Sequence, residues 1–161
     1  MRIRTAIMKD LAAVTALEAA CFPPNEAAKE RDFAARLAVY PHCFWLLEEE
    51  DGTLVSFING MVTDEPFLRD EMYENAALHQ EDGAWQMIFG VNTLPAYRRQ
   101  GCAARVMCQV IADAKARGRR GCVLTCKETL IHYYETFGFQ SEGVSRSTHG
   151  GVVWYDMRLT F

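Results

Sequence analysis

The residues with the clearest chemical potential form a short basic turn at positions 98–101, which reads Arg-Arg-Gln-Gly. An apolar, strand-like run at 85–91 precedes this turn, and an amphipathic helical run at 103–117 follows it. The first amides of a helix have no partner within it, and the helix dipole places partial positive charge there. Small residues let an anion approach the backbone. The pattern therefore predicts a site for a phosphorylated cofactor; the alternative is an ordinary loop with a solvated basic face.

Two common phosphate motifs are absent from this turn. No Gly-Lys-Ser/Thr follows it, which excludes a Walker A loop, and Gly101 lacks the two spaced glycines of a dinucleotide-binding motif. The pattern Arg98-x-x-Gly101-x-Ala103 instead resembles the acyl-CoA pyrophosphate loop of the GNAT N-acetyltransferases. The preceding Pro95-x-Tyr97-Arg98 is also similar to a sequence that this family often carries.

A second motif lies about thirty residues downstream. The stretch at 133–139, Tyr-Tyr-Glu-Thr-Phe-Gly-Phe, resembles the Tyr-Glu-x-x-Gly-Phe signature of the same family, with Tyr134 at the functional tyrosine. Helical spacing puts Ile131, Tyr134 and Phe137 on one face, and Gly138 is placed to end the helix in a left-handed conformation. The alternative for Tyr134 is packing in the core.

The elements that must position these motifs follow from hydrophobic periodicity and turn residues. Asp10 and Asn25 are expected to cap the first two helices, which the prolines at 23–24 separate, and Asp51-Gly52 predicts a hairpin. Strands are expected at 2–6, 43–49, 54–62, 85–93, 122–126, 139–143 and 152–159. Helices are expected at 10–22, 25–40, 103–117 and 129–137, with a short helix around 67–77.

This order of elements is that of the GNAT fold, and the resemblance covers essentially the whole chain. It implies a single domain over residues 1–161, of mixed α/β (α+β) class, with a central sheet of about six to seven strands flanked by helices. In this family the central parallel strands splay apart after a bulge, and acyl-CoA enters the cleft between them.

The resemblance also implies a cofactor, acetyl-CoA, and the residues that would hold it. The backbone of Val91, Asn92 and Thr93 would bind the pantetheine and the acetyl carbonyl, and Arg98 would add charge near the pyrophosphate. The pyrophosphate itself would accept hydrogen bonds from the amides of Arg99, Gln100, Gly101, Cys102, Ala103 and Ala104.

Within the family, the arylalkylamine (serotonin) N-acetyltransferase branch is similar at 22–28, 97–101 and 126–139. Its animal members carry His-x-His before the phosphate loop as a route for the amine's proton. The matching positions here are Met87 and Phe89, and neither side chain can carry a proton.

The base is therefore lost or moved. Glu26 and His132 are candidates for it, whereas Gln86 could only orient a water molecule. An amine can also lose its proton to bulk water before binding, so a strong base is not required.

The expected reaction is direct transfer of the acetyl group to an amine. The oxyanion would be held by the N–H of Val91, and Tyr134 would protonate the leaving thiolate. An acyl-enzyme on Cys126 is the rival route, although no adjacent His-Asp pair would activate that thiol.

The expected acceptor is a primary amine, and an arylalkylamine is one candidate. The residues expected to contact it are Phe22, Glu26, Met87, Phe89 and Thr125. A polyamine, an amino acid or a peptide N-terminus stays open as acceptor. A catalytically weak acyl-CoA-binding regulatory domain is the alternative of a different class.

Composition bounds the partners and the location. A net charge of −4 over 161 residues gives no global basic field for nucleic acid, and no apolar run approaches the 18 residues of a membrane span. The N-terminus has no signal-peptide core, so a cytoplasmic location is expected. The protein is expected to be a monomer or a homodimer.

The six cysteines form no CxxC pair and accompany no histidine cluster, so no metal site is expected. They fit buried free thiols in a reducing compartment. Cys102 is expected to be modifiable, because the start of a helix stabilises a thiolate. The basic cluster at 117–120 is expected either at a helix C-terminus or near the outer phosphate of the cofactor.

Overall fold

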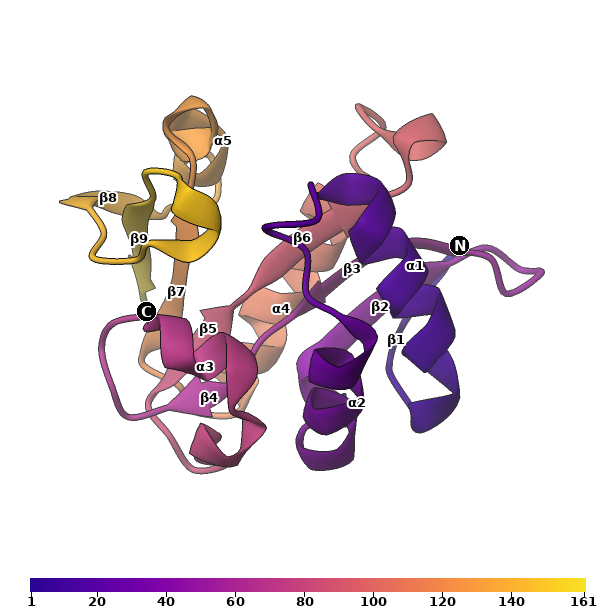
Figure 1. Ribbon diagram of the computed structural model, residues 1–161, viewed down its shortest axis with the longest axis horizontal. Coiled ribbons are helices and arrows are strands. Elements are labelled where there is room, and N and C mark those ends of the chain that lie inside the picture. Colours follow the sequence, from indigo (N-terminus) through magenta and orange to yellow (C-terminus); the bar gives the residue numbers. More distant parts are fainter.

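The computed structural model describes the whole chain, residues 1–161, with nine strands in two sheets (Figure 1). The antiparallel four-stranded sheet has the order β1 (Arg2–Thr5), β2 (Phe44–Glu48), β3 (Leu54–Asn59) and β6 (Gly90–Thr93). The five-stranded sheet has the order β4 (Val62–Thr63), β5 (Trp85–Ile88), β7 (Gly121–Cys126), β9 (Tyr155–Thr160) and β8 (Gln140–Val144). Only its β5–β7 pair is parallel. The mixed α/β class expected from the sequence is confirmed.

The two sheets meet where the expected strand at 85–93 breaks at Phe89. Before the break, β5 pairs with β7 from Trp85 to Ile88, and after it β6 pairs only with β3. The strands β6 and β7 therefore diverge, as Figure 1 shows. The expected strand at 54–62 also breaks, between Asn59 and Val62. A Cβ at Gly60 would lie 1.8 Å from the carbonyl oxygen of Met87, so the close approach at this break requires glycine. These two breaks turn the seven expected strands into nine.

Five α-helices surround the sheets. The helices α1 and α2 lie in front of the strands in Figure 1, and α4 lies behind them. Their bounds are α1 (Leu11–Cys21), α2 (Glu30–Val39), α3 (Asp70–Glu74), α4 (Cys102–Ala116) and α5 (Ile131–Glu135). No helix is long and apolar enough to cross a membrane.

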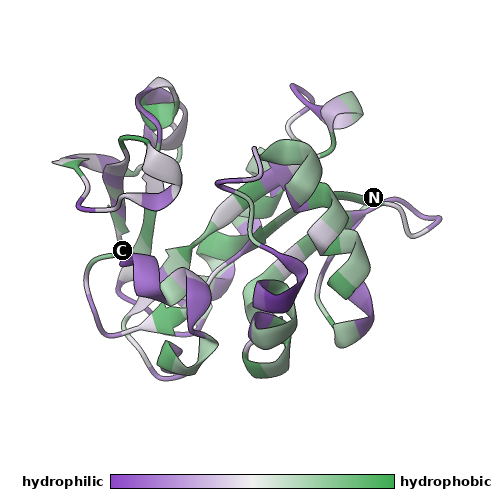
Figure 2. Cartoon of the chain, viewed as in Figure 1, coloured by the Kyte–Doolittle hydropathy of each residue, from purple (hydrophilic) through white to green (hydrophobic).

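The core lies between these helices and the central strands. Every residue of β2 is buried, because α4 covers one face of its sheet and α1 and α2 cover the other. Three aromatic rings, Phe33, Phe44 and Phe57, pack with centroids 5.9–6.4 Å apart. Figure 2 shows the matching hydropathy, with apolar residues along the inner strands. Burial of these rings contributes more apolar area per residue than any aliphatic side chain.

The second helix begins later than the sequence predicted. Asn25 does not cap it, since α2 starts at Glu30 and the carboxylate of Asp32 accepts the Lys29 amide at 2.9 Å. Residues 23–27 instead form a turn in which the carbonyl of Pro23 accepts two amides. The side chain of Asn25 is thereby free to donate to a distant loop, at Gly150.

The cap expected at the first helix is also wrong. The Asp10 carboxylate accepts the Ile7 amide at 2.8 Å and a bidentate pair of bonds from Arg4, so it caps a preceding 3₁₀ turn rather than α1.

Two expectations near the C-terminal end of the chain, about the last helix and the glycine after it, differ in outcome. The helix expected at 129–137 is shortened to α5, but Gly138 takes the predicted left-handed conformation, with φ +100°.

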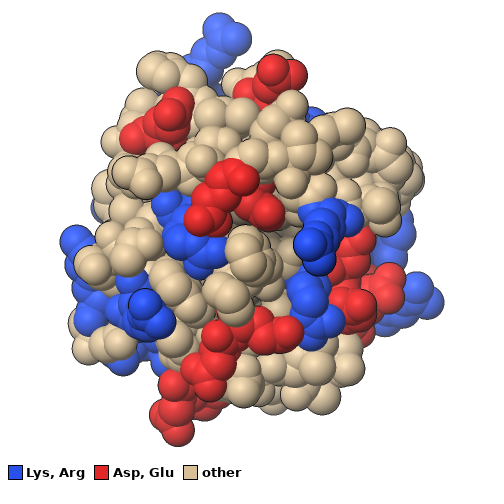
Figure 3. All heavy atoms as spheres, turned by 90° about the vertical axis from the view of Figure 1, so that its left-hand side faces the viewer, with Lys and Arg blue, Asp and Glu red and all other residues tan.

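Charged side chains of both signs are interspersed on the face seen in Figure 3, the left-hand side of Figure 1. This distribution agrees with the small net charge of −4. The basic cluster at 117–120 lies at the end of α4, where Arg119 donates to the carbonyls of Glu81 and Gly83. The cluster therefore holds the C-terminal end of α4 against the segment that contains Glu81 and Gly83.

Candidate active site

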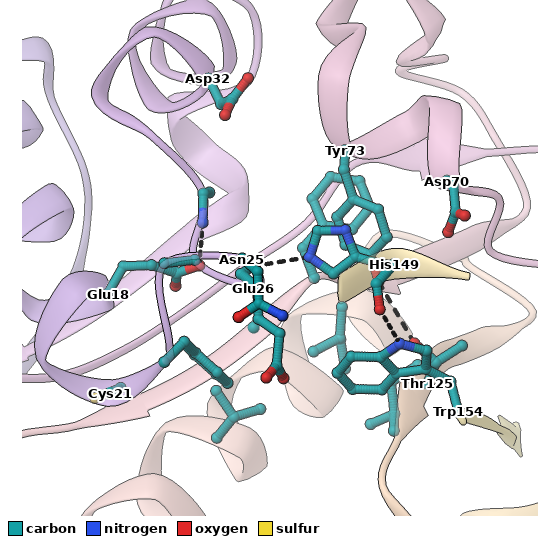
Figure 4. A pocket seen from close by; sticks show the side chains of 18 of the residues that line it. Glu18, Cys21, Asn25, Glu26, Asp32, Asp70, Tyr73, Thr125, His149 and Trp154 are labelled. Atoms are coloured by element: carbon teal, nitrogen blue, oxygen red, sulfur yellow. Dashed lines mark hydrogen bonds between the residues drawn. The ribbon is translucent and has the colours of Figure 1, made fainter. Parts of the chain in front are cut away.

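A cavity of about 680 Å³ lies where β6 and β7 diverge. Its walls come from the loop after α1, from α3, from the facing ends of β6 and β7, from α5 and from the β8–β9 loop (Figure 4). The structure brings together here most of the residues that the sequence predicted for the acyl group and its acceptor. Those that line the cavity are Phe22, Glu26, Phe89, Val91, Thr125 and Tyr134.

Met87 does not reach this cavity. Its side chain is fully buried in the core, and its backbone amide donates to Met61 across the sheet. The break in the strand explains the difference. Met87 and Phe89 are two residues apart and would share a face of a continuous strand, but Met87 belongs to the paired part of β5, whereas Phe89 lies at the break. The expected acceptor contact at Met87 is therefore corrected.

The open edge of β6 presents backbone groups to the cavity. The amide of Leu94 donates to Val55 of β3 at 2.8 Å, and in an antiparallel ladder such bonds alternate along the strand. The amides of Val91 and Thr93 therefore point away from β3. Consistent with this direction, the carbonyl of Thr93 accepts the thiol of Cys21.

The turn before α4 has an unusual backbone. Arg99 is the only residue other than glycine with positive φ, at +63°, and Gly101 follows at +79° as the residue before the helix. None of the six successive amides from Arg99 to Ala104 makes a hydrogen bond within the protein. Consecutive free N–H groups in left-handed and right-handed alternation form a concave anion site. Strain of this kind persists where the surrounding structure enforces it.

The side chains of this turn differ in access. Arg98, Arg99 and Gln100 are exposed and can approach an anion, whereas Cys102 is only 6% exposed. Its thiol packs into the core, so the expectation of a modifiable Cys102 is wrong. The exposed cysteine is Cys108, on the outer face of α4.

Tyr134 lies on the β7 side of the cavity, buried among other aromatic rings. It is 7% exposed, and the rings of Tyr133 and Phe139 lie 5.2 and 6.1 Å away by centroid. Burial, with lesser contributions from Tyr133 and Cys126, raises the pKa of its hydroxyl well above the usual range. Tyr134 therefore stays protonated at neutral pH and can donate a proton.

Cys126, the rival nucleophile, is held in its thiol form. Burial raises its pKa to about 11, and only a thiolate is an effective nucleophile.

Two loops meet across the acceptor side of the cavity. Asn25 donates to the carbonyl of Gly150 at 2.9 Å, and the ring of His149 donates through Nε2 to the carbonyl of Glu26 at 2.8 Å. The carboxylate of Glu26 forms an ion pair with Lys127 at 2.9 Å. Figure 4 shows Asn25 and Glu26 between Glu18 on one side and His149 on the other. We call this joined pair of loops, residues 22–29 and 145–154, the strap.

The other two candidates for a proton route lie outside the cavity. The side chain of His132 is 93% exposed and points to solvent. Gln86 is buried, and its side-chain amide donates hydrogen bonds to the carbonyls of Gly60 and Met87. Neither lines the cavity.

Sequence reasoning missed several residues of the cavity wall. They include Glu18, Arg36, Tyr73, His149 and Trp154. One signal was available, since Glu18 follows Leu17 on the apolar stripe of α1, where a carboxylate is out of place. The other residues come from segments whose approach depends on tertiary packing.

His42, His79 and Glu81 form a separate group whose ligand atoms lie within 4.8 Å of one another. Nδ1 of His79 accepts the amide of Val62 at 3.1 Å, so its Nε2 carries the proton and donates to Glu81 at 2.7 Å. A metal at Nε2 would need that lone pair and would set Nδ1–H against the Val62 amide. The group is therefore a hydrogen-bonded cluster rather than a candidate metal centre.

Comparison with known proteins identifies the family. Residues 11–139 match the model of the acetyltransferase (GNAT) family. Serotonin N-acetyltransferase of Mesocricetus auratus is 27% identical over 112 residues, which cover 69% of this chain and 53% of that enzyme. The chain thus matches about half the length of this curated relative.

Two solved structures share the fold over nearly the whole chain. The GNAT-like decarboxylase GphF, in complex with isobutyryl-CoA, has a TM-score of 0.85 at 22% identity, with 99% of each chain covered. The ribosomal-protein-S18-alanine N-acetyltransferase of Escherichia coli has a TM-score of 0.74 at 20% identity, with 99% of this chain and 92% of that chain covered. This chain belongs to the GNAT acetyltransferase family.

Proposed function

We propose that this GNAT-family chain is an N-acetyltransferase that moves the acetyl group of acetyl-CoA to a primary amine in a ternary complex. One observation carries the proposal: the divergence of β6 and β7 opens the edge of β6 toward a cavity that also contains Tyr134. The edge amides suit a thioester carbonyl, and the turn before α4 suits a pyrophosphate.

The chain's own groups support a direct mechanism. The amide of Val91 would hold the thioester oxygen as it gains negative charge during attack by the amine. The protonated hydroxyl of Tyr134 would then protonate the sulfur of the leaving coenzyme A. Holding amine and thioester together in one cavity contributes much of the rate, because both groups are intrinsically reactive.

The acceptor we favour is an amine with an aromatic group. Aromatic side chains surround the acceptor side of the cavity, with Tyr73 placed 4.9 Å from Phe89 and 5.1 Å from His149 by ring centroid. Flat rings of this kind stack on an aryl group. Glu26 supplies negative charge for an ammonium. The similarity to serotonin N-acetyltransferase points the same way, and a peptide N-terminus or a polyamine is the alternative.

The test is turnover of acetyl-CoA with a panel of amines, followed by release of free thiol. The panel contains tryptamine, spermidine, free amino acids and a short peptide that begins with alanine. We expect turnover with tryptamine above the rate without amine. Tight binding of coenzyme A without turnover on any amine would instead support a regulatory acyl-CoA-binding domain.

A second candidate function is decarboxylation of an acyl-CoA that carries a carboxylate on its acyl group. The observation that favours it is that the cavity is lined by three side chains able to donate to a carboxylate: Lys127, His149 and Thr125. The fold shared with a GNAT-like decarboxylase agrees. It ranks second because Glu18 and Glu26 line the same cavity and repel an anion. Release of CO₂ from malonyl-CoA, without any amine, would support it.

A further inference from the structure

Glu18 is a charged residue on the buried face of α1, and the proposed mechanism leaves it without a role. Its side chain lines the cavity, and the residue is only 6% exposed. One carboxylate oxygen, Oε2, accepts the amide of Ala28 at 2.9 Å, whereas Oε1 is buried without a hydrogen-bond partner. A buried, unpartnered carboxylate oxygen destabilises a fold, so its presence in a cavity wall points to use by a ligand.

A small space beside Gly90 connects Oε1 to the strand that carries the proposed oxyanion donor. A Cβ at Gly90 would lie 3.4 Å from Oε1 of Glu18, 3.4 Å from Nδ2 of Asn92 and 3.9 Å from Nδ2 of Asn59. Asn92 is fully buried, and neither polar atom of its side chain has a partner. A position ringed by several polar atoms suits an ordered water. Gly90 lines the cavity and precedes Val91, so this water position adjoins the acyl site.

We infer that Glu18 accepts the proton of the attacking amine through a water held beside Gly90. The inference rests on the proposed acetyl transfer. As the nitrogen–carbon bond forms and the carbon–sulfur bond breaks, one proton passes from nitrogen through the water to Glu18. Tyr134 gives its own proton to the sulfur, and the proton on Glu18 returns to Tyr134 by way of solvent, so the cycle closes.

The surroundings of Glu18 make its carboxylate a stronger base than an exposed glutamate. Burial raises its pKa above the ordinary value. The Ala28 backbone amide, Arg36 on α2, the side-chain amide of Asn92 and His149 of the strap all oppose this shift, but burial outweighs them. The Asn92 side chain acts by proximity, because it does not meet the geometry of a hydrogen bond to Glu18. Arg36 is already engaged, since it donates to Oδ1 of Asn59 and to the carbonyl of Tyr73.

The other groups around the cavity are less suited to the task. Glu26 is paired with Lys127. His149 donates through Nε2 to the Glu26 carbonyl, and its Nδ1, which can accept a proton, belongs to the strap and is not among the atoms around Gly90. Met87 and Phe89 have no group that can accept a proton.

The test is the pH dependence of kcat for Glu18→Gln, measured from pH 5.5 to 9.5 with acetyl-CoA and the amine of the panel that the natural protein turns over fastest. Loss of a general base lowers kcat by about 10²-fold at pH 7. We expect this loss to shrink to less than about tenfold at pH 9.5, because hydroxide and bulk water then take the proton. Coenzyme A affinity, measured by calorimetry, is expected to stay unchanged.

A second variant blocks the water without touching the carboxylate. Gly90→Ala places a methyl group at ordinary contact distance from Glu18 and Asn92, so the chain can fold around it. We expect the same pH-dependent loss of kcat. Glu48→Gln is the matched control, since Glu48 is a buried glutamate in a remote ion pair with Arg4, and its pH profile should equal that of the natural protein.

The outcomes separate this inference from the proposed function. If no amine is turned over by the natural protein, both are wrong. If turnover occurs and Glu18→Gln has full activity, or a loss that is equal at every pH, Glu18 is not the proton acceptor although acetyl transfer stands. If Glu18→Gln does not bind coenzyme A, Gly90→Ala decides on its own.

Discussion

The two halves of the cavity are built in different ways. The half proposed for the cofactor uses the backbone of one continuous stretch, 91–104, with Gly101 and Arg99 held in left-handed conformation. The half proposed for the acceptor uses side chains from four separated segments: the two loops of the strap, α3 and the end of β7. A backbone site tolerates most side-chain changes, whereas a side-chain site can be altered one residue at a time.

The largest effect should come from the group that serves both halves. Tyr134→Phe removes the hydroxyl and keeps the buried ring, so the fold and cofactor binding should be retained. We expect kcat at pH 7 to fall by about 10³-fold, within the range for general acid catalysis. Thiol release measures the rate. An unchanged rate would mean that the thiolate leaves without help from Tyr134.

The backbone half can be broken at Gly101. A left-handed conformation costs an alanine about 1–2 kcal/mol. We expect the unliganded turn of Gly101→Ala to relax, so that coenzyme A must restore this conformation and binds roughly tenfold more weakly. At saturating cofactor, kcat should stay close to that of the natural protein. Calorimetry gives the affinity.

Gly52→Ala is a matched control for that change. Gly52 has φ +89° in the β2–β3 hairpin, and, as at Gly101, no atom lies within 4 Å of its Cβ position. It should lose similar stability without any loss of coenzyme A affinity. Equal affinity losses in the two variants would refute the phosphate role of the turn.

The side-chain half can be weakened at Glu26. Glu26→Gln removes the ion pair with Lys127, whose side chain is 43% exposed, so the expected effect is below about 1 kcal/mol. We expect the KM for the amine to rise about three- to fivefold, with coenzyme A affinity unchanged. Glu142→Gln, which removes a similar pair with Arg158 on β8 and β9, should leave both constants as they are. A change in cofactor affinity would show that the halves are not independent.

The smallest effect concerns stability. Because burial raises the pKa of Glu18 in the folded chain, the folded state holds its proton more tightly than the unfolded state. Stability is then lost as the pH rises from the unfolded pKa of glutamate, about 4.3, through the raised value. Glu18→Gln should therefore have a higher melting temperature than the natural protein at pH 7, and the gain should shrink as the pH falls toward the unfolded pKa of glutamate. A lower melting temperature at pH 7 would contradict this origin.

The same contrast explains what could be predicted from the sequence. The fold class, the hairpin at Asp51-Gly52 and the turn before α4 follow local patterns, and the structure confirms each of these elements. The break at Phe89 was not visible in the sequence itself, because it arises where the partner of the strand changes from β7 to β3. The helix cap predicted at Asn25 is wrong for a similar reason, because that side chain instead donates a hydrogen bond to the other loop of the strap.

For the candidate site, the basic turn at 98–104 could be recognised from its local pattern, and the family resemblance implied 91–93 and Tyr134; the roles of all these residues stay predictions. Sequence reasoning missed Arg36, Tyr73 and His149, because no sequence spacing connects them. Glu18 was detectable as a carboxylate on an apolar stripe. Its unpartnered oxygen became evident only when Gly90 and Asn92 were placed beside it.

The strap also bears on the order in which the two substrates bind. Its two hydrogen bonds, from Asn25 to Gly150 and from His149 to Glu26, join two loops on the acceptor side, whereas the turn before α4 is exposed to solvent. We therefore expect acyl-CoA to enter without disturbing the strap, and an amine to enter after those bonds break. The opening rate of the two loops, rather than the chemical step, would then limit turnover. A kcat that falls as solvent viscosity rises would be the sign of this limit.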